Sequence, residues 1–332
     1  MEAAAEGAAV AGFEPGQHLP EAHEDGVWAL AWTSRDQLIS GSVDETVKVW
    51  SAAEGQGERG TLEKTCSFDG HHLGIISAVP SSTGEWLVTS ALDHFIRIWS
   101  LLTPSTPVRK LAPAPLESWS LALDKSDTLL ATGTQKGAVH VWNVESGNLQ
   151  CALKPDAPRE HFILSVAFDE SSTPADGQVH VAAGGDDGSV ALYDLESQKM
   201  LYRIAESSKA HALPVRGLAF LRDGNMLATG SDDSRIHLYD TRSQNLIATF
   251  SEHRSWILDL AVSPDGDFIA SGSSDRFAKV WDIRMGECVF TSPQMEDQVW
   301  SVAWNKDGST LAAGVDDGSI QIFHRKPAER EA

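Results

Sequence analysis

The chain has 332 residues, of which 42% are hydrophobic and 8% aromatic, which is enough for a large buried core. Its 47 acidic residues outnumber 26 basic ones, and the net charge of −21 argues against direct binding to nucleic acid, because a phosphate backbone selects clustered Lys and Arg. No apolar run approaches the roughly 20 residues of a membrane span, so we expect a soluble protein without membrane contact.

Residues 1–9 are expected to form a flexible tail, because they are rich in Ala and Glu and lack the basic start and apolar run of a signal peptide. Three cysteines, Cys66, Cys151 and Cys288, share no short spacing. Their odd number and the missing secretory signal indicate a reducing compartment.

Seven segments share one pattern, in which an apolar run, a Gly/Ser/Asp cluster and a second alternating run follow one another. This pattern is typical of two strands joined by a tight turn. The segments lie at 38–50, 87–99, 130–142, 180–198, 227–240, 269–282 and 311–323. The aromatic residues that close them are 42 to 51 residues apart, a period that suits four short strands per unit.

A further strand is expected before each hairpin, at 26–32, 74–79, 118–123, 162–168, 215–220, 256–262 and 299–304. These runs are almost continuously apolar, as in strands that are covered on both faces, so they should be innermost. A weaker fourth strand follows the hairpins, for instance at 245–250 and 287–292. Four-stranded sheets that stack and close into a ring predict an all-β, seven-bladed β-propeller spanning residues 10–324 as a single domain.

Ring closure needs a strand from outside the last repeat, because residues 325–332 form a polar tail that cannot supply one. The segment Val10 to Leu19 is the spare one, and we predict that it pairs as the outer strand of the last blade. Pro15 and Gly16 weaken its strand pattern, but proline is tolerated on a sheet edge.

Paired aspartates recur in the turns, as in Asp186-Asp187-Gly188, and could be calcium ligands or turn residues. A calcium loop would need oxygen ligands at several alternating positions. Val, Ala and Leu stand at those positions here. The sequence therefore predicts no metal site, and it predicts no cofactor.

The residues from about 21 to 324 resemble the WD-repeat family, in which an Asp, a His, a hydroxyl and an indole N–H form a hydrogen-bonded chain in each blade. The resemblance implies four structural tetrads. They are His23, Ser40, Asp44 and Trp50; His71, Thr89, Asp93 and Trp99; His211, Thr229, Asp233 and Tyr239; and His253, Ser271, Asp275 and Trp281.

Repeats three, four and seven depart from this pattern. The departures are Lys136 for the turn Asp, Ala183 and Ala313 for the hydroxyl, and Ala114, Arg159 and Met295 for the His. Apolar packing should hold these blades.

The order of the repeat signatures is similar to that of the WD-repeat subunit of the superkiller (Ski) complex, which is also found in the RNA polymerase II-associated factor (Paf) complex. This resemblance implies a non-catalytic adaptor, a monomeric propeller within a hetero-complex, in the cytoplasm and the nucleus. Its partners would be the tetratricopeptide scaffold and the helicase of the Ski complex, in support of 3'-5' mRNA decay by the cytoplasmic exosome, and Paf complex subunits in transcription elongation.

The resemblance also implies that short partner segments of the form Gln-Arg-x-x-aromatic bind the top face, where the loop with the family His enters the inner strand. Counting from the His positions, the expected partner-binding residues are Trp28, Ile76, Trp119, Phe162, Leu164, Arg216, Trp256, Leu258 and Trp300, with Pro214 and Gln298 beside them. The alternative is that these side chains only pack between blades. Trp32 and Trp304 are expected in the core.

An enzyme is the first rival reading, but no Gly-x-Ser-x-Gly, metal-ligand spacing or phosphate-binding loop is present, so we expect no catalytic residues. Other WD-repeat scaffolds remain open, because a fold does not specify its partner. They include a ubiquitin-ligase substrate receptor, a chromatin reader and a G-protein β-like signalling protein.

Overall fold

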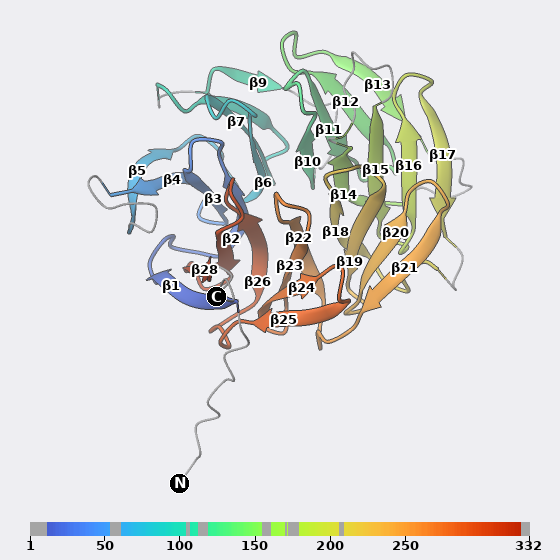
Figure 1. Cartoon of the computed structure of the whole chain (residues 1–332). Coiled ribbons are helices and arrows are strands. Elements are labelled where there is room, and N and C mark those ends of the chain that lie inside the picture. The colour runs from blue at the N-terminus through green and yellow to red at the C-terminus, as the bar shows by residue number, and fades with distance from the viewer. Residues whose placement is uncertain are drawn as a thin grey trace.

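The computed structural model describes residues 12–53, 61–103, 107–111, 119–154, 161–169, 171, 179–205 and 209–326. These residues form seven four-stranded antiparallel sheets arranged as blades around a common axis (Figure 1). No helix in this part of the chain has the length and apolar character needed to cross a bilayer. The predicted seven-bladed propeller is confirmed.

The inner strands are β2 (Val27–Trp32), β6 (Ile75–Pro80), β10 (Leu121–Leu123), β14 (Ile163–Phe168), β18 (Val215–Phe220), β22 (Ile257–Val262) and β26 (Val299–Trp304). The second strands are β3 (Leu38–Ser42), β7 (Trp86–Ala91), β11 (Leu129–Gly133), β15 (His180–Gly185), β19 (Met226–Ser231), β23 (Phe268–Ser273) and β27 (Thr310–Val315). β10 is shorter than predicted, because Trp119 and Ser120 precede the strand.

The third strands are β4 (Val47–Ala52), β8 (Ile96–Ser100), β12 (Val139–Asn143), β16 (Val190–Asp194), β20 (Ile236–Asp240), β24 (Ala278–Asp282) and β28 (Ile320–Arg325). The outer strands are β5 (Leu62–Phe68), β9 (Arg109–Leu111), β13 (Leu149–Leu153), β17 (Lys199–Ile204), β21 (Asn245–Phe250), β25 (Glu287–Thr291) and β1 (Phe13–Leu19). Blades 1 to 6 each take four consecutive strands from β2 onward, and blade 7 consists of β26, β27, β28 and β1.

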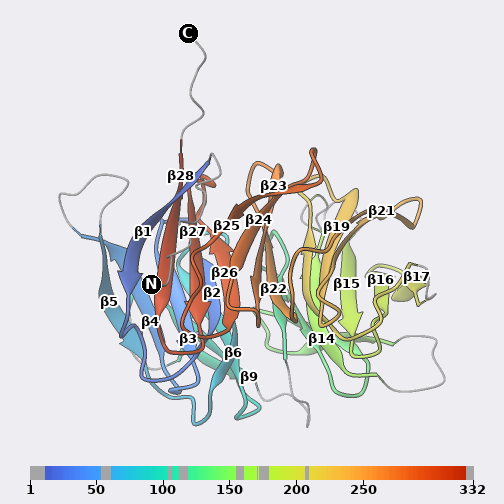
Figure 2. The same ribbon diagram turned by 90° about the horizontal axis from the view of Figure 1, so that it is seen from below.

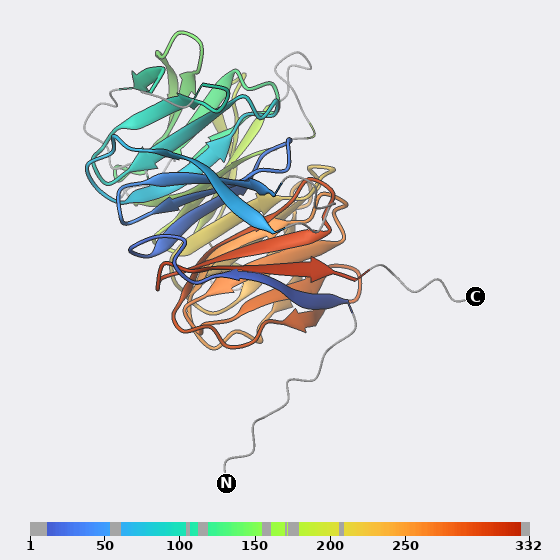
Figure 3. The same ribbon diagram turned by 90° about the vertical axis from the view of Figure 1, so that its left-hand side faces the viewer.

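Strand β1 closes the ring, as predicted, by pairing antiparallel with β28 from Phe13 opposite Arg325 to Leu19 opposite Ile320 (Figures 2 and 3). The pairing shifts register between Pro15 and His18, so the proline lies at an irregular edge where a missing N–H is tolerated. Two boundaries differ from the prediction. The described strand begins at Phe13, since Val10 lies outside the described residues, and β28 continues through Arg325, whose backbone N–H donates to Ser309.

A glutamine side chain joins the closing strand to blade 1. The Gln17 side-chain amide donates to the Leu62 carbonyl at 3.0 Å and accepts from the Leu62 N–H at 2.6 Å. This reciprocal pair imitates one step of a β-ladder between β1 and β5. The seam of the ring is therefore fastened by β-pairing within blade 7 and by a side chain across to blade 1.

Candidate functional site

A β-bulge interrupts six of the seven inner strands near their start, within the described residues. The pairing with the second strand skips one residue in each, between Val27 and Ala29 in blade 1 and at the equivalent place in the others. The skipped residues are Trp28, Ile76, Leu164, Arg216, Leu258 and Trp300. A bulge leaves one residue out of the ladder and re-aims its side chain.

These side chains converge on a single cavity of about 200 Å³ at the top end of the ring axis. We call its seven upper residues the mouth. They are Trp28, Ile76, Trp119, Leu164, Arg216, Leu258 and Trp300. All seven were predicted from the repeat spacing. The structure thus brings together residues that are as much as 272 positions apart in the chain.

One side of the mouth is an aromatic pair across the seam between blades 7 and 1. The rings of Trp28 and Trp300 lie 4.8 Å apart at 31°. The Trp28 indole N–H donates to the Asp316 carboxylate at 2.9 Å. The indole nitrogen of Trp300 is buried and has no hydrogen-bond partner among the described residues.

Blade 5, two blades from Trp300, contributes the one cation of the mouth. Arg216 donates through Nε and Nη2 to the two carboxylate oxygens of Asp232, at 2.7 and 3.0 Å. Its guanidinium lies 5.7 Å from the ring of Trp256, which is 49% exposed. Trp256 is therefore a solvent-facing apolar surface beside the cavity, as the sequence predicted by position, although it does not line the cavity itself.

Phe162 also lies beside the mouth and packs edge-on against Trp119, with ring centroids 6.1 Å apart. Pro214 and Gln298 do not line the cavity and instead use their carbonyls to accept the N–H of Asp232 and Asp316. Trp304 is buried in the core, as expected, and Trp32 is partly buried against the blade 1 core.

A polar belt lies one residue below the mouth. Ser301 accepts from the Leu30 N–H, Ser120 from the Val166 N–H, and Asp259 from Ser301 and the Val302 N–H. Each of these acceptors bridges two adjacent blades. Because β2, β14 and β26 are edge strands of their sheets, these backbone donors have no strand partner on the axis side, and the belt satisfies them inside the ring. The floor of the cavity is therefore structural, and sequence reasoning missed it.

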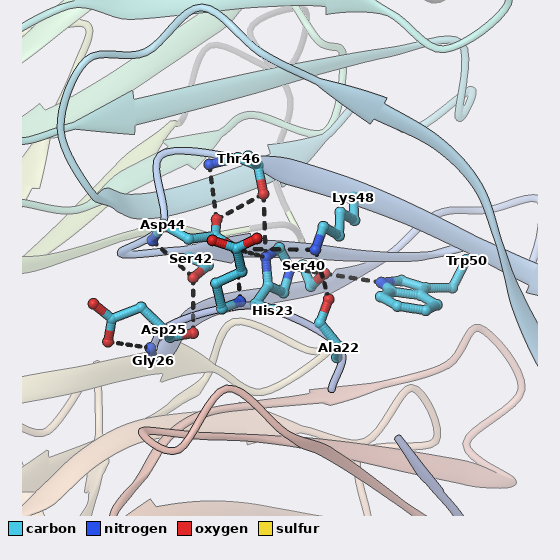
Figure 4. Close-up of polar contacts among 11 residues, drawn as sticks. Ala22, His23, Asp25, Gly26, Ser40, Ser42, Asp44, Thr46, Lys48 and Trp50 are labelled. Carbon is cyan, nitrogen blue, oxygen red and sulfur yellow. Dashed lines mark hydrogen bonds and ion pairs between the residues drawn. The ribbon is translucent and has the colours of Figure 1, made fainter. Parts of the chain in front are cut away.

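The tetrads lie outside the mouth, nearer the middle of each blade. In blade 1 the His23 ring bonds Asp44 through Nδ1 at 2.8 Å and Ser40 through Nε2 at 2.7 Å, and Trp50 donates to Ser40 at 2.8 Å (Figure 4). Burial alone would raise the pKa of the Asp44 carboxyl, but the hydrogen bonds from His23 and Thr46 outweigh it and hold that pKa well below its ordinary value.

Blades 2 and 6 have the same chain of contacts. His71 bonds Thr89 and Asp93, with Trp99 donating to Thr89, and His253 bonds Ser271 and Asp275, with Trp281 donating to Ser271. Blade 2 also buries Arg97, which is 1% exposed and donates to Asp93 at 2.7 Å. The sequence pattern did not reveal this buried ion pair.

Blade 5 corrects the expectation that Tyr239 replaces the tryptophan. His211 bonds Asp233 at 2.9 Å and Thr229 at 2.8 Å, but the Tyr239 hydroxyl reaches further, donating to the Lys209 carbonyl and contacting His237. The phenol is a different length from the indole and its polar atom is at the tip. The tyrosine therefore closes the blade through a different set of partners.

Blades 3, 4 and 7 lack complete tetrads. Trp142 still donates to Thr132 at 3.2 Å in blade 3, and Met295 and Phe323 line an apolar crevice in blade 7. In blade 4, His161 contacts Asp187 at 3.4 Å. Ala114 and Arg159, the residues assigned to the family His, lie outside the described residues.

One described group, His161, Asp186 and Asp187, places three possible metal ligands within 4.8 Å of one another. Both carboxylate oxygens of Asp187 already have protein partners, since Ser189 donates to one and Arg203 to the other. A cation would have to displace the arginine, so the donor set fits an ion-pair cluster better than a metal site.

Acidification should destabilise the fold. Burial, with Arg97 nearby, lowers the pKa of His71 to about 4, and burial beside His211 lowers that of His237 to about 4. In the unfolded chain both histidines have a pKa near 6.5. Between about pH 6.5 and pH 4 the unfolded chain therefore binds more protons than the folded chain. Stability is therefore lost as the pH falls through this window, by about 3 kcal/mol per histidine.

Asp259 opposes this loss, because burial raises its pKa to about 6 and the folded chain then takes up its proton first. That uptake restores about 2 kcal/mol between roughly pH 6 and pH 4.5, leaving a net loss of about 3–4 kcal/mol at pH 4.5. Urea titrations at neutral pH and at about pH 4.5 measure this net loss in the free energy of unfolding. Asp259→Ala should steepen the dependence, and equal stability at the two pH values would contradict the assignment.

Comparison with known proteins agrees with this architecture. The family profile "WD domain, G-beta repeat" matches residues 14–51, 62–100, 244–282 and 286–324. A second profile, "Anaphase-promoting complex subunit 4 WD40 domain", matches residues 180–261. The first profile covers four of the seven repeat hairpins and the second covers two more, so the hairpin at 130–142 is the one outside both.

Similar curated proteins include "WD repeat-containing protein VIP3" of Arabidopsis thaliana, 33% identical over 61% of this chain and 62% of that protein. "WD repeat-containing protein SL1-17" of Schistosoma mansoni is 29% identical over 63% and 64% of the two chains. "Striatin-4" of Mus musculus is 27% identical over 54% of this chain and 25% of that protein. The chain thus spans less than two thirds of the length of these relatives. The chain is thus a seven-bladed β-propeller in which four segments match the WD-repeat profile.

Proposed function

We propose that this protein is a non-catalytic adaptor that captures a short partner segment at the mouth. The observation that carries the proposal is the convergence of the bulge residues on one cavity, with an aromatic pair and an anchored arginine among them. Clustered Trp and Arg side chains on a rigid rim are the typical composition of an interface centre. Such a site needs no reactive group.

The charge around the seam favours a basic occupant. The four loops beside Trp28 and Trp300, at 20–26, 43–46, 292–298 and 316–319, contain nine Asp or Glu and no Lys or Arg. Exposed members include Glu24, Asp25 and Glu296. Oppositely charged surfaces raise the association rate and the selectivity for a partner more than they raise the affinity. A basic segment with an aromatic or aliphatic anchor suits both the rim and the cavity.

The assembly that we propose is of the Ski type, with the tetratricopeptide scaffold and the helicase as partners, and the Paf complex as a second setting. The support is the order of the repeat signatures along the sequence. In this role the adaptor would work in the cytoplasm and the nucleus and would assist 3'-5' mRNA decay without touching RNA itself.

The binding site is tested with a fluorescent synthetic peptide of the form Gln-Arg-x-x-aromatic, titrated with purified protein. Trp28→Ala/Trp300→Ala should weaken binding at least about 30-fold, because central tryptophans typically contribute 2 kcal/mol or more. Leu73→Ala is the matched control, since Leu73 is a 49% exposed apolar residue on the same face outside the mouth. Equal losses in both variants would refute the site.

The assembly is tested by affinity purification of the tagged wild type beside the same double variant, with thermal melts to show that both fold. Recovery of a helicase and a tetratricopeptide scaffold by the wild type alone is the expected result. Recovery of ubiquitin-ligase, chromatin or G-protein partners instead would overturn the Ski-type assignment and leave the propeller scaffold.

A further inference from the structure

We propose that Asp316 and Asp232, the first carboxylates of the paired-Asp turns in blades 7 and 5, are positioning residues that hold the mouth in its binding-ready arrangement. They act through Trp28 and Arg216. The inference rests on the proposed function for its binding readout, but its structural claim can be measured without a ligand.

In the paired turns of blades 5 and 7, the two carboxylates have different hydrogen-bond partners. In blade 5 the second carboxylate, Asp233, bonds the tetrad histidine His211. In blade 7 the second carboxylate, Asp317, accepts from the Ser319 N–H at 2.9 Å, as a turn aspartate does. The first carboxylate is not used by the turn in either blade. Its side chain is free to act elsewhere, and in both blades it contacts the mouth.

The backbone places these first carboxylates beside the mouth. The N–H of Asp232 donates to Pro214 and that of Asp316 to Gln298, both at about the same distance, 3.0 and 2.9 Å. Each accepting carbonyl lies two residues before a bulge residue of its own blade. The turn is therefore tied to the loop that leads into the bulge, and its first side chain reaches the top of the ring axis.

Asp316 acts across the seam. It accepts the Trp28 indole N–H at 2.9 Å, and Trp28 in turn lies against Trp300. The space for this carboxylate depends on Gly26, because a Cβ there would lie 2.3 Å from Asp316 Oδ1 and 3.1 Å from the Trp28 indole nitrogen. A glycine at this place thus makes room for the bond that orients the tryptophan pair.

Asp232 acts within blade 5. Its side chain is 6% exposed and both its oxygens accept from Arg216, whose side chain is 20% exposed. A bidentate pair of this kind fixes the plane of the guanidinium as well as its position. The bidentate pair thereby holds the arginine beside the exposed ring of Trp256.

Both carboxylates reduce the same cost of binding. A free tryptophan or arginine side chain loses rotamer freedom when a partner orders it, and a side chain that is already held loses less. Removing a carboxylate should therefore weaken the partner's binding even though no contact with the partner is deleted.

The first experiment compares three variants in the titration with the Gln-Arg-x-x-aromatic peptide. Asp316→Ala should weaken binding by about fivefold to tenfold, on the order expected for one lost charge-assisted hydrogen bond. Asp316→Asn should restore most of the affinity, because its carbonyl oxygen still accepts from the indole N–H. Asp317→Ala is the matched control in the same turn and should weaken binding by about twofold or less, because it removes one charge of the acidic loops but no contact with the mouth. An Asn variant as weak as the Ala variant would mean that Asp316 acts by charge, and would overturn the positioning role.

A double-mutant cycle separates positioning from direct contact. Trp28→Phe keeps an aromatic ring but has no N–H for Asp316 to hold, so adding Asp316→Ala to it should cause no further loss. Gly26→Ala should lose affinity as Asp316→Ala does, since it displaces the carboxylate without deleting it. A full additional loss in the Trp28→Phe background would contradict the inference.

The third experiment needs no peptide. In two-dimensional ¹H–¹⁵N spectra of the whole chain, the Trp28 indole signal is assigned as the one missing in Trp28→Phe. It should move upfield in Asp316→Ala and stay near its wild-type position in Asp316→Asn and Asp317→Ala. An unmoved signal in Asp316→Ala would overturn the positioning role. If the wild type fails to bind the peptide while the signal moves as expected, the proposed function fails and the positioning role stands.

Discussion

Phe13→Ala is expected to lower the free energy of unfolding by about 3–5 kcal/mol, the usual cost of truncating a buried phenylalanine. Phe13 is 5% exposed and is the first residue of β1. Its ring lies 5.2 Å from Phe290 and 5.8 Å from Trp304, so it anchors the closing strand in the core between blades 6 and 7. Losing this anchor weakens both the core and the seam of the ring.

Urea unfolding followed by circular dichroism measures the effect, with His18→Ala as the control. His18 belongs to the same strand but its side chain is exposed, so its removal should change stability by less than about 0.5 kcal/mol. Equal losses at the two positions would show that β1 contributes pairing alone and that its apolar anchor is unimportant.

Asp93→Ala should lower the free energy of unfolding by about 3–5 kcal/mol, because it leaves the buried Arg97 guanidinium without its counter-charge. Asp93 also contacts His71 and accepts from the N–H groups of His72 and Phe95. The side chains of Asp93 and Arg97 are 6% and 1% exposed, so water cannot replace the lost partner. Chemical denaturation of the purified variant provides the measurement.

Two further variants identify the cause of that loss. Asp93→Ala/Arg97→Met should recover about 2 kcal/mol or more, since it removes the stranded charge together with its partner. Asp317→Ala, at the same turn position in blade 7, should cost only about 1 kcal/mol, because that blade has Met295 in place of the histidine and Ala313 in place of the hydroxyl. A double variant no more stable than Asp93→Ala would argue that the turn hydrogen bonds, and not the buried charge, cause the loss.

The repeat pattern predicted most of the strands because it depends on local physics. Alternating apolar residues around a Gly/Ser/Asp turn favour a hairpin wherever they occur, and the period then fixes four strands per blade. The prediction was less accurate where local signals were weak. β10 has three residues instead of the six expected, and β28 extends to Arg325 because it pairs with Phe13, more than 300 residues earlier in the chain.

The position of the mouth was also predictable, because a fixed count from each family His leads to the bulge residue. Trp28, Leu164 and Leu258 were all located in this way. The sequence left open whether they only pack between blades or face a common cavity. The structure shows the cavity, since each bulge takes its residue out of the ladder at the same height on the ring axis.

Tetrad contacts followed the spacing in blades 1, 2 and 6, where each chain of hydrogen bonds connects segments about 20 residues apart. Blade 5 did not follow it, because the partner of a tyrosine hydroxyl depends on how far the ring reaches. Tyr239 bonds the Lys209 carbonyl, a group that no spacing rule designates.

The sequence by itself determined the blade count and the residues at the mouth, because both depend on a pattern repeated within some 50 residues. It determined the closing strand by elimination, because the last repeat lacks a fourth strand. Only the tertiary structure decided which carboxylates support the mouth. Asp316 meets Trp28 across 288 positions of the chain, and this contact exists because the ring closes and brings blade 7 against blade 1. Contacts across that seam depend on the geometry of the whole ring, so no local pattern encodes them.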